Sequence, residues 1–232
     1  MAATQEVIAD ELAYLASLVQ LQNTSVVELG CGKADFARKL VERTGVATVT
    51  ALEVDRIQHQ RNVEGPQHPR LSFVYGGAEE IPLSDAFADG VVMMKSLHHV
   101  PVPQMDRAIE EIRRILKPGG WLYVSEPMYA GEFNEIVRLF HDEGVVRAEA
   151  YQALKRALSA RVLEADLEHE FMAPLAFRDY EDFVEKIVRA THSEHNYTDE
   201  VASEVRRRFA EYETPEGARF IRPMRVNLMH RR

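Results

Sequence analysis

Short apolar runs alternate with amphipathic segments through the first half of this 232-residue chain. This alternation constrains the fold, because each run has the length of a β-strand and each following segment has helical periodicity. We expect strands at 25–29, 48–54, 71–75, 90–94 and 121–125, and helices at 35–43, from 56 onward and at 105–116. Several runs are apolar on both faces, which is typical of a parallel sheet covered on both sides.

The pattern changes after Tyr129. Further helices are expected at 133–141, 148–163, 180–190 and 198–212, further strands at 168–177 and 219–229, and an N-terminal helix at 5–21. We therefore predict an α/β fold with a doubly wound, Rossmann-like sheet, mostly parallel with an antiparallel last strand, plus an inserted helical lid. One domain would span 1–232, with a cofactor-binding core at 1–127, lid helices and a sixth strand at 129–213, and the last strand at 218–230.

The composition excludes several classes of protein. The formal net charge of −9 disfavours nucleic acid as a partner, and the single cysteine precludes an internal disulfide and fits a reducing cytoplasm. We find neither an apolar run near the roughly 20 residues that span a membrane nor a secretory signal. No metal is expected, since His192-x-x-His195 lacks a third ligand. Eight arginines from Arg206 onward are interpreted as a solvated helix face and an edge strand rather than an anion site.

A glycine turn, Glu28-Leu29-Gly30-Cys31-Gly32, joins the first expected strand to the first helix of the alternating region. Such a turn brings bare backbone and a helix N-terminus against a small ligand. A dinucleotide fingerprint would need a third glycine where Asp35 stands. The carboxylate of Glu28 suits an ammonium group better than a pyrophosphate.

Glu53 ends the second expected strand, about 20 residues past the turn. A carboxylate in this place can accept hydrogen bonds from both hydroxyls of a ribose. Asp55 is the competing candidate on the same side of the strand. We favour Glu53 because it lies nearer the carboxyl edge of the apolar run.

Three more stretches follow in order: Phe73–Pro82, Asp89–Val100 and Leu116–Leu122. With Glu28-x-Gly30-x-Gly32 and Glu53, their sequence and spacing resemble the successive motifs of class I S-adenosylmethionine-dependent methyltransferases, in the methyltransferase type 11-like group. The resemblance covers roughly residues 20–127. It implies S-adenosylmethionine as the cofactor and S-adenosylhomocysteine as the product.

The resemblance also implies roles for individual residues. Glu28, Gly30 and Gly32 would hold the methionine end of the cofactor, with Cys31 packing in the same turn, and Lys95 would meet the methionine moiety. Glu53 would bind the ribose, Val54 would pack on the adenine, and Ala78, through its backbone N–H, and Glu79 would line the adenine pocket.

Two residues depart from the family pattern. Ala34 stands where a third glycine is frequent, a small change that should still fit. Gly77 replaces an aspartate that commonly contacts the adenine amino group, so this hydrogen bond is either lost or passed to Glu79 or Glu80.

Three residues are candidates for acting on the methyl acceptor. Methyl transfer from a sulfonium is an in-line displacement, and a general base is needed only when the nucleophile must lose a proton. His98 and His99 follow the fourth strand, where the resemblance places the methyl group, although histidines there can also merely shape the loop. Glu126, at the carboxyl end of the fifth strand, is a second candidate for binding or deprotonating the acceptor.

The favoured function is methyl transfer to a small-molecule acceptor in the cytoplasm. The alternatives are a methyltransferase that acts on RNA or protein and, because of Gly77, an inactive partner subunit that binds the cofactor. A nicotinamide-dependent oxidoreductase is disfavoured by Asp35. The sequence predicts neither the acceptor, nor the atom that is methylated, nor the oligomeric state.

Overall fold

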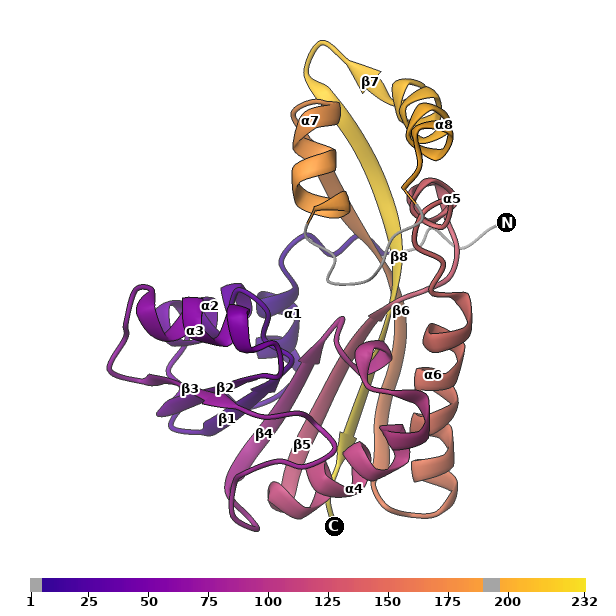
Figure 1. Cartoon of the computed structure of the whole chain (residues 1–232). Helices are drawn as coiled ribbons and strands as arrows, with labels where there is room; N and C mark the ends of the chain where they lie inside the picture. The colour runs from indigo at the N-terminus through magenta and orange to yellow at the C-terminus, as the bar shows by residue number, and fades with distance from the viewer. Residues whose placement is uncertain (1–5, 190–196) are drawn as a thin grey trace. The chain divides into compact units, whose positions relative to one another are not determined.

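The computed structural model describes residues 6–189 and 197–232. Its strands form one sheet in the order β3-β2-β1-β4-β5-β8-β6, with β7 paired to β8 (Figure 1). The strands are β1 (Ser25–Leu29), β2 (Thr48–Glu53), β3 (Leu71–Tyr75), β4 (Ala88–Met94), β5 (Leu116–Pro127), β6 (Glu164–Phe177), β7 (Glu213–Thr214) and β8 (Gly217–His230). The helices are α1 (Glu11–Leu18), α2 (Asp35–Arg43), α3 (Arg56–Glu64), α4 (Met105–Ile115), α5 (Glu132–Val137), α6 (Gly144–Ser159), α7 (Tyr180–Phe183) and α8 (Asp199–Ala210).

The chain divides into two compact units. Among the described residues, the core unit comprises 10–126, 146–169 and 225–232, and the second unit comprises 6–9, 127–145, 170–189 and 197–224. The strands β6 and β8 contribute residues to both units.

The first five strands of the core unit are parallel, as the sequence predicts. Glu28 of β1 pairs with Ala51 of β2 on one side and with Val92 of β4 on the other. The chain therefore builds outward from β1 through β2 to β3 and then returns to place β4 on the opposite side of β1. This reversal of strand order between β1 and β4 is the place where α/β sheets bind their ligands.

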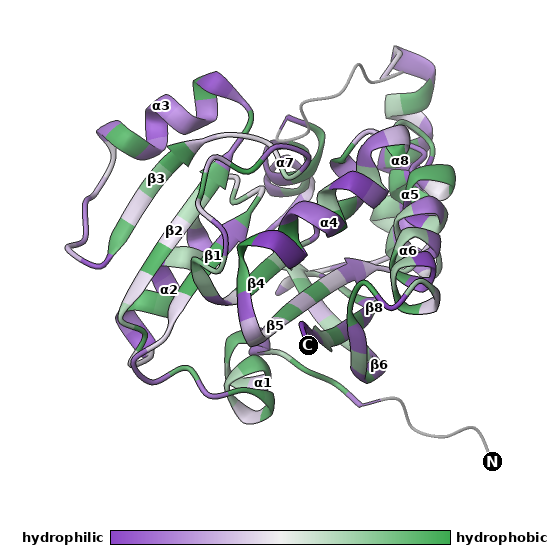
Figure 2. Cartoon of the chain, turned by 90° about the horizontal axis from the view of Figure 1, so that it is seen from below, coloured by the Kyte–Doolittle hydropathy of each residue, from purple (hydrophilic) through white to green (hydrophobic). Residues whose placement is uncertain are grey.

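Apolar side chains hold helices on this parallel sheet. The inward residues of α4, among them Ile109, Ile112 and Ile115, are fully buried and join one cluster with Val27 and Met93 of the strands. The outward residues of α3 and α4 are mostly hydrophilic (Figure 2). Figure 1 shows α1, α2 and α3 grouped beside β1, β2 and β3.

The last strand, β8, runs antiparallel to β5. In the core unit the Arg231 N–H donates to Gly120 O at 2.8 Å, and in the second unit the Met128 N–H donates to Pro223 O at 2.9 Å. Residue numbers rise along β5 as they fall along β8, which defines the antiparallel direction. The predicted fold class, a mostly parallel sheet with an antiparallel last strand, is confirmed.

The second unit has its own aromatic core. Phe177 packs against Phe133, Phe183, Phe209 and Phe220, with ring centroids 5.4–6.1 Å apart. Rings at this separation gain stabilisation beyond the area they bury. This cluster ties α5, α7 and α8 to the outer parts of β6 and β8.

Several element boundaries differ from those expected. The helix expected at 5–21 is the shorter α1, because Asp10 caps it by accepting a hydrogen bond from the Ala13 N–H at 3.2 Å. The helix expected at 180–190 is α-helical only over Tyr180–Phe183 and continues as a π-helical turn at Val184–Val188. The fifth strand is longer than expected because pairing with β8 extends it.

None of the helices in the described parts of the chain combines the length and the apolar character needed to cross a lipid bilayer.

Candidate active site

The candidate site lies in the core unit, at the carboxyl ends of β1, β2, β3, β4 and β5. Loops that follow parallel strands meet at this edge of the sheet. Nearly all of the candidates from the sequence follow or end one of these five strands.

The glycine turn after β1 has the backbone geometry that its residues allow. Gly30 and Gly32 have φ of 67° and 53°, and Ala34 adopts φ of 59° just before α2. A Cβ on Gly30 would lie 2.7 Å from the Cβ of Ser96, so only glycine fits there. A Cβ on Gly32 would meet nothing within 4 Å, which leaves the backbone of the turn open to a ligand.

Glu28 is a buried carboxylate with an unsatisfied oxygen. Its side chain is only 2% exposed, and its Oε2 has no hydrogen-bond partner. Burial raises the pKa of Glu28 from its ordinary 4.5 to about 8, and the positive charge of Lys95 partly opposes this rise. Burying such a group is costly unless a cation or donor pairs with it. Glu28 therefore fits the ammonium group of an amino-acid ligand.

Glu53 connects the second strand to the glycine turn. Its Oε2 accepts a hydrogen bond from the Gly32 N–H at 2.7 Å, and its Oε1 accepts one from the Asp55 N–H at 2.9 Å. Each carboxylate oxygen has two acceptor sites, so both oxygens can still accept a hydroxyl. Asp55 caps α3 instead, by accepting from the Ile57 N–H at 2.8 Å. The geometry thus favours Glu53 over Asp55 as the ribose ligand.

The loop after β3 accommodates the unusual Gly77. A Cβ on Gly77 would lie 2.4 and 2.6 Å from the two carboxylate oxygens of Glu79. The Glu79 carboxylate therefore occupies the space that a side chain at position 77 would take. Ala78 is buried, Glu80 is exposed, and Val54 at the end of β2 is 56% exposed.

Lys95 follows β4 in a left-handed conformation, with φ of 59°. Its N–H donates to Ser125 O at 2.7 Å, which ties the loop to β5. Its Nζ lies 3.9 Å from Oε2 of Glu11 in α1. Lys95 thus connects the loop after β4 to β5 through its backbone and to α1 through its side chain.

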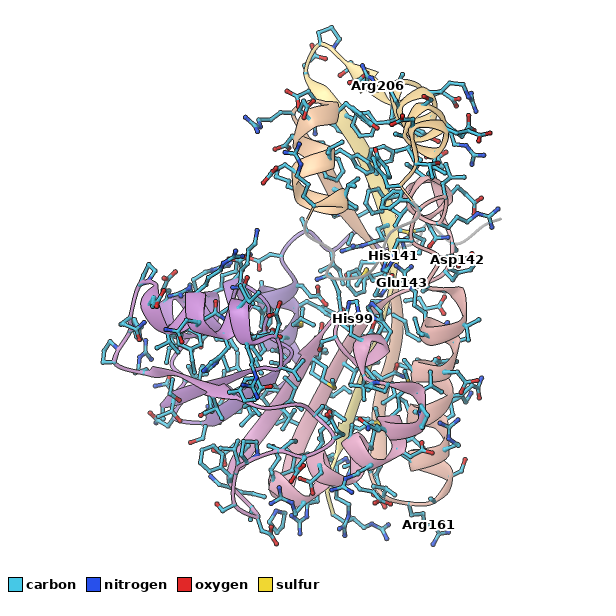
Figure 3. The ribbon with its side chains drawn as sticks, in the orientation of Figure 1. His99, His141, Asp142, Glu143, Arg161 and Arg206 are labelled. Atoms are coloured by element: carbon cyan, nitrogen blue, oxygen red, sulfur yellow. The ribbon has the colours of Figure 1, made fainter. Side chains whose placement is uncertain are left out.

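His98 and Glu126 form a hydrogen-bonded pair. His98, in the 3₁₀ turn η1 (Leu97–His99), is 4% exposed, and its Nδ1 makes a short hydrogen bond with Oε2 of Glu126. The other carboxylate oxygen of Glu126 accepts from the Leu97 N–H at 2.8 Å. Because the carboxylate holds the proton on Nδ1, Nε2 is the nitrogen that can accept a proton. His99, labelled in Figure 3, is exposed, and its ring centroid lies 4.1 Å from that of His98.

Comparisons with known proteins find methyltransferases. A family model described as a methyltransferase domain matches residues 26–120. The chain is 30% identical over 120 residues to phthiotriol/phenolphthiotriol dimycocerosates methyltransferase 1 of Mycobacterium ulcerans, covering 52% of this chain and 44% of that protein. Residues 26–120 thus match a methyltransferase domain, and the chain resembles the class I S-adenosylmethionine-dependent methyltransferases.

Other known proteins match part or most of this chain in the same way. The fatty-acid O-methyltransferase of Mycolicibacterium smegmatis is 25% identical, over 71% of this chain and 61% of that protein. The chain spans less than two thirds of the length of either curated methyltransferase. The structure of the YcgJ protein from Bacillus subtilis shares the fold, with a TM-score of 0.66 at 16% identity, over 95% of this chain and 97% of that one.

Two residues near Lys95 were missed in the sequence. The Tyr123 hydroxyl donates to Oε1 of Glu11 at 3.3 Å, and burial, together with the charge of Glu11, raises the pKa of this fully buried tyrosine. The hydroxyl in an otherwise apolar strand was the available signal, since a buried hydroxyl needs a partner. Glu11 gave no signal, because its expected helix is simply amphipathic.

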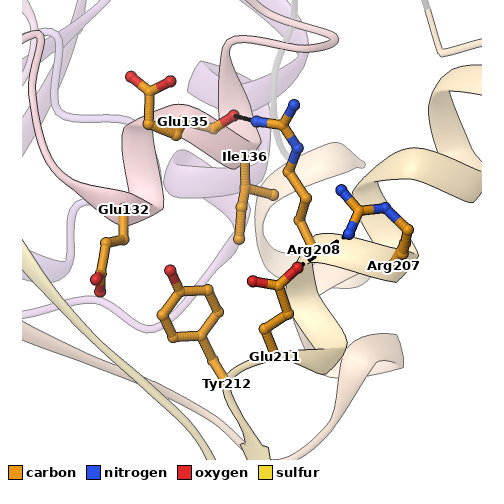
Figure 4. A pocket seen from close by; sticks show the side chains of 7 residues that line it. All are labelled: Glu132, Glu135, Ile136, Arg207, Arg208, Glu211 and Tyr212. Atoms are coloured by element: carbon orange, nitrogen blue, oxygen red, sulfur yellow. Dashed lines mark hydrogen bonds and ion pairs between the residues drawn. The ribbon is translucent and has the colours of Figure 1, made fainter.

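The second unit holds a separate hollow of about 270 Å³ (Figure 4). It is lined by Glu132, Glu135, Ile136, Arg207, Arg208, Glu211 and Tyr212. Its arginines are already bound, since Arg207 pairs with Glu211 at 3.0 Å and Arg208 donates to the Glu135 carbonyl oxygen at 3.2 Å. We assign no chemistry to it.

One histidine of the second unit forms a pair with a nearby carboxylate. His141 pairs with Glu143, with 2.8 Å between Nε2 and Oε1, in the segment labelled in Figure 3. His192 and His195 lie outside the described residues.

Proposed function

We propose that this protein transfers a methyl group from S-adenosylmethionine to a small-molecule acceptor. The observation that carries the proposal is the buried carboxylate of Glu28, whose Oε2 has no partner, beside the open backbone of the glycine turn. An ammonium group would satisfy this carboxylate, and an amino-acid tail supplies one. Dinucleotide cofactors carry a pyrophosphate instead, which Glu28 would repel.

Under this proposal each loop binds one part of the cofactor. Glu28 pairs with the ammonium group, Lys95 with the carboxylate, and the backbone of Gly30, Cys31 and Gly32 borders the methionine chain. Glu53 accepts from the ribose hydroxyls. Val54, Ala78 and Glu79 border the adenine, and Glu79 takes the place of the side chain that Gly77 lacks. The cofactor, when bound, supplies a methyl group on a positively charged sulfur.

Under the same proposal, His98 acts as the general base and Glu126 orients it. His98 Nε2 accepts the proton that the acceptor loses as its nucleophilic atom takes the methyl group. The Glu126 carboxylate keeps the proton on Nδ1 and stabilises the imidazolium that results. His99 lines the same loop and contacts the ring of His98.

Two observations support a small acceptor. The named relatives include a fatty-acid O-methyltransferase and a phthiotriol dimycocerosates methyltransferase, both of which act on small molecules by name. The arginine-rich C-terminal stretch is also largely paired with acid. Its ion pairs are Arg206–Glu213, Arg207–Glu204, Arg208–Glu204, Arg225–Glu168 and Arg232–Glu164. Paired arginines on a chain of net charge −9 do not make a phosphate-binding surface.

We also propose that the protein works in the cytoplasm, because a single cysteine fits a reducing compartment.

Calorimetry with S-adenosylhomocysteine tests the cofactor site. The unaltered chain should bind in the micromolar range, and Glu53→Ala should weaken binding by at least about tenfold, because the ribose hydroxyls lose a charged acceptor. Glu80→Gln is the matched control, since it removes an exposed charge from the neighbouring loop and should leave the affinity unchanged. A chain that binds neither S-adenosylmethionine nor S-adenosylhomocysteine would refute the proposed function.

Transfer of a tritiated methyl group tests the acceptor class. The protein is incubated with labelled S-adenosylmethionine and a cell extract separated into metabolites, RNA and protein. We expect label in the metabolite fraction. Label that is retained in RNA or protein, and that requires the active protein, would instead support a macromolecular acceptor.

A further inference from the structure

Lys95 lies within the influence of two carboxylates in the core unit. Its Nζ is 3.9 Å from Oε2 of Glu11, and its positive charge also lowers the pKa of the buried Glu28. Glu28 lies near the end of β1, Lys95 follows β4, and Glu11 is the first residue of α1. Three separate elements therefore bring opposite charges together at the edge of the sheet where the cofactor is proposed to bind.

Glu11 is held firmly in place. It occupies the first turn of α1, whose Leu12 and Leu15 are buried and whose N-terminus is capped by Asp10. Its side chain is only 15% exposed, and its Oε1 accepts from the hydroxyl of the fully buried Tyr123. The carboxylate thus presents its other oxygen, Oε2, toward Lys95 from a fixed position.

The backbone of Lys95 is fixed as well, while its side chain is inherently adaptable. The left-handed backbone and the hydrogen bond from its N–H to Ser125 O set where the side chain starts. A lysine stem has four carbons and many rotamers, so neighbouring charges decide where the ammonium group lies. The Glu11 carboxylate, 3.9 Å away, is one such charge.

We propose that Glu11 is a positioning residue that fixes the Lys95 ammonium group where it can meet the carboxylate of the cofactor's amino-acid moiety. This inference rests on the proposed function. Without Glu11, the flexible Lys95 side chain would no longer be held in one place, and binding would have to order it. Glu11 therefore sets the affinity for the zwitterionic end of the cofactor without touching it.

The test compares two ligands in calorimetry of Glu11→Gln. S-adenosylhomocysteine carries the amino-acid moiety, whereas 5′-methylthioadenosine has the same nucleoside and sulfur but no ammonium or carboxylate. We expect Glu11→Gln to weaken S-adenosylhomocysteine binding by about tenfold, the scale of one partly buried ion pair, and to leave 5′-methylthioadenosine binding unchanged. A merely structural role for Glu11 would weaken both ligands alike.

Two further variants make the comparison sharp. Asp10→Asn changes the adjacent carboxylate, which pairs with Arg43, yet keeps a good N-cap, so it should leave both affinities unchanged. In Lys95→Met, addition of Glu11→Gln should cause no further loss, because Glu11 acts through Lys95. Three results would overturn the inference and leave the proposed function intact. They are S-adenosylhomocysteine binding that is unchanged or tighter in Glu11→Gln, equal losses of affinity for both ligands, and additive losses in the double variant. Failure of the unaltered chain to bind either ligand would overturn both.

Discussion

Glu28→Gln is expected to lose about 100-fold or more in affinity for S-adenosylmethionine and yet to be more stable than the unaltered protein in alkaline solution. The loss of affinity follows from removing one member of a buried charge pair, which costs about 3–5 kcal/mol. The gain in stability follows because the unaltered protein buries a carboxylate with an unsatisfied oxygen. A neutral amide of the same shape avoids most of that cost.

The pH dependence of this stability difference has a definite sign. The pKa of Glu28 is raised by burial from its ordinary 4.5 to about 8 in the folded protein. Between these values the folded protein keeps a proton that the unfolded chain has released, so the stability of the unaltered protein falls as the pH rises through this interval. Glutamine does not titrate. The advantage of Glu28→Gln should therefore be small near pH 4.5, grow up to about pH 8 and stay constant above it.

Urea denaturation of both proteins at pH 5 and pH 9, with calorimetry of S-adenosylhomocysteine at pH 8, measures these effects. Comparison of the two proteins at each pH cancels the titration of every other group. A stability difference that is the same at both pH values would show that Glu28 titrates normally. Binding retained by the variant would remove Glu28 from the cofactor site.

The alternation of strands and helices in the first half made the parallel sheet predictable, because each element carries its own periodicity. The preference for Glu53 over Asp55, made because Glu53 lies nearer the carboxyl edge of the apolar run, stays a prediction. The structure adds the reason why Asp55 is occupied elsewhere: it caps α3. Strands and helices whose residues carry a local periodicity could therefore be predicted from the sequence.

What depended on register and long-range contact could not be predicted. His98 and Glu126 were separate candidates from the sequence. The register that pairs Met94 of β4 with Ser125 of β5 brings the loop after β4 beside Glu126, and the two side chains form a hydrogen bond. The contact of Glu11 with Tyr123, 112 residues away, has no counterpart in local periodicity. The π-helical turn at Val184–Val188 likewise follows from packing in the second unit rather than from residue type.

Glu126→Ala is expected to lower the free energy of unfolding by about 2–5 kcal/mol. The substitution leaves the Leu97 N–H and the Nδ1–H of the buried His98 without their acceptor, and each unsatisfied buried donor costs about 1–3 kcal/mol. Glu126→Gln should lose roughly half as much, because its amide oxygen can still accept from one of the two donors. Glu110→Ala, which removes an exposed carboxylate from α4, is the matched control and should stay within about 0.5 kcal/mol of the unaltered protein.

The same variant separates structural support from catalysis. Glu126→Gln should retain its affinity for S-adenosylhomocysteine, because Glu126 contacts the His98 loop and not the proposed cofactor ligands. Its methyl transfer should fall by about 100-fold with an acceptor that must lose a proton, since His98 would lose the carboxylate that orients it and stabilises its charge. With an acceptor that has no proton to lose, the rate should change little. Equal losses with both kinds of acceptor would mean that the pair only holds the loop, whereas a loss confined to the proton-bearing acceptor would require His98 as the base.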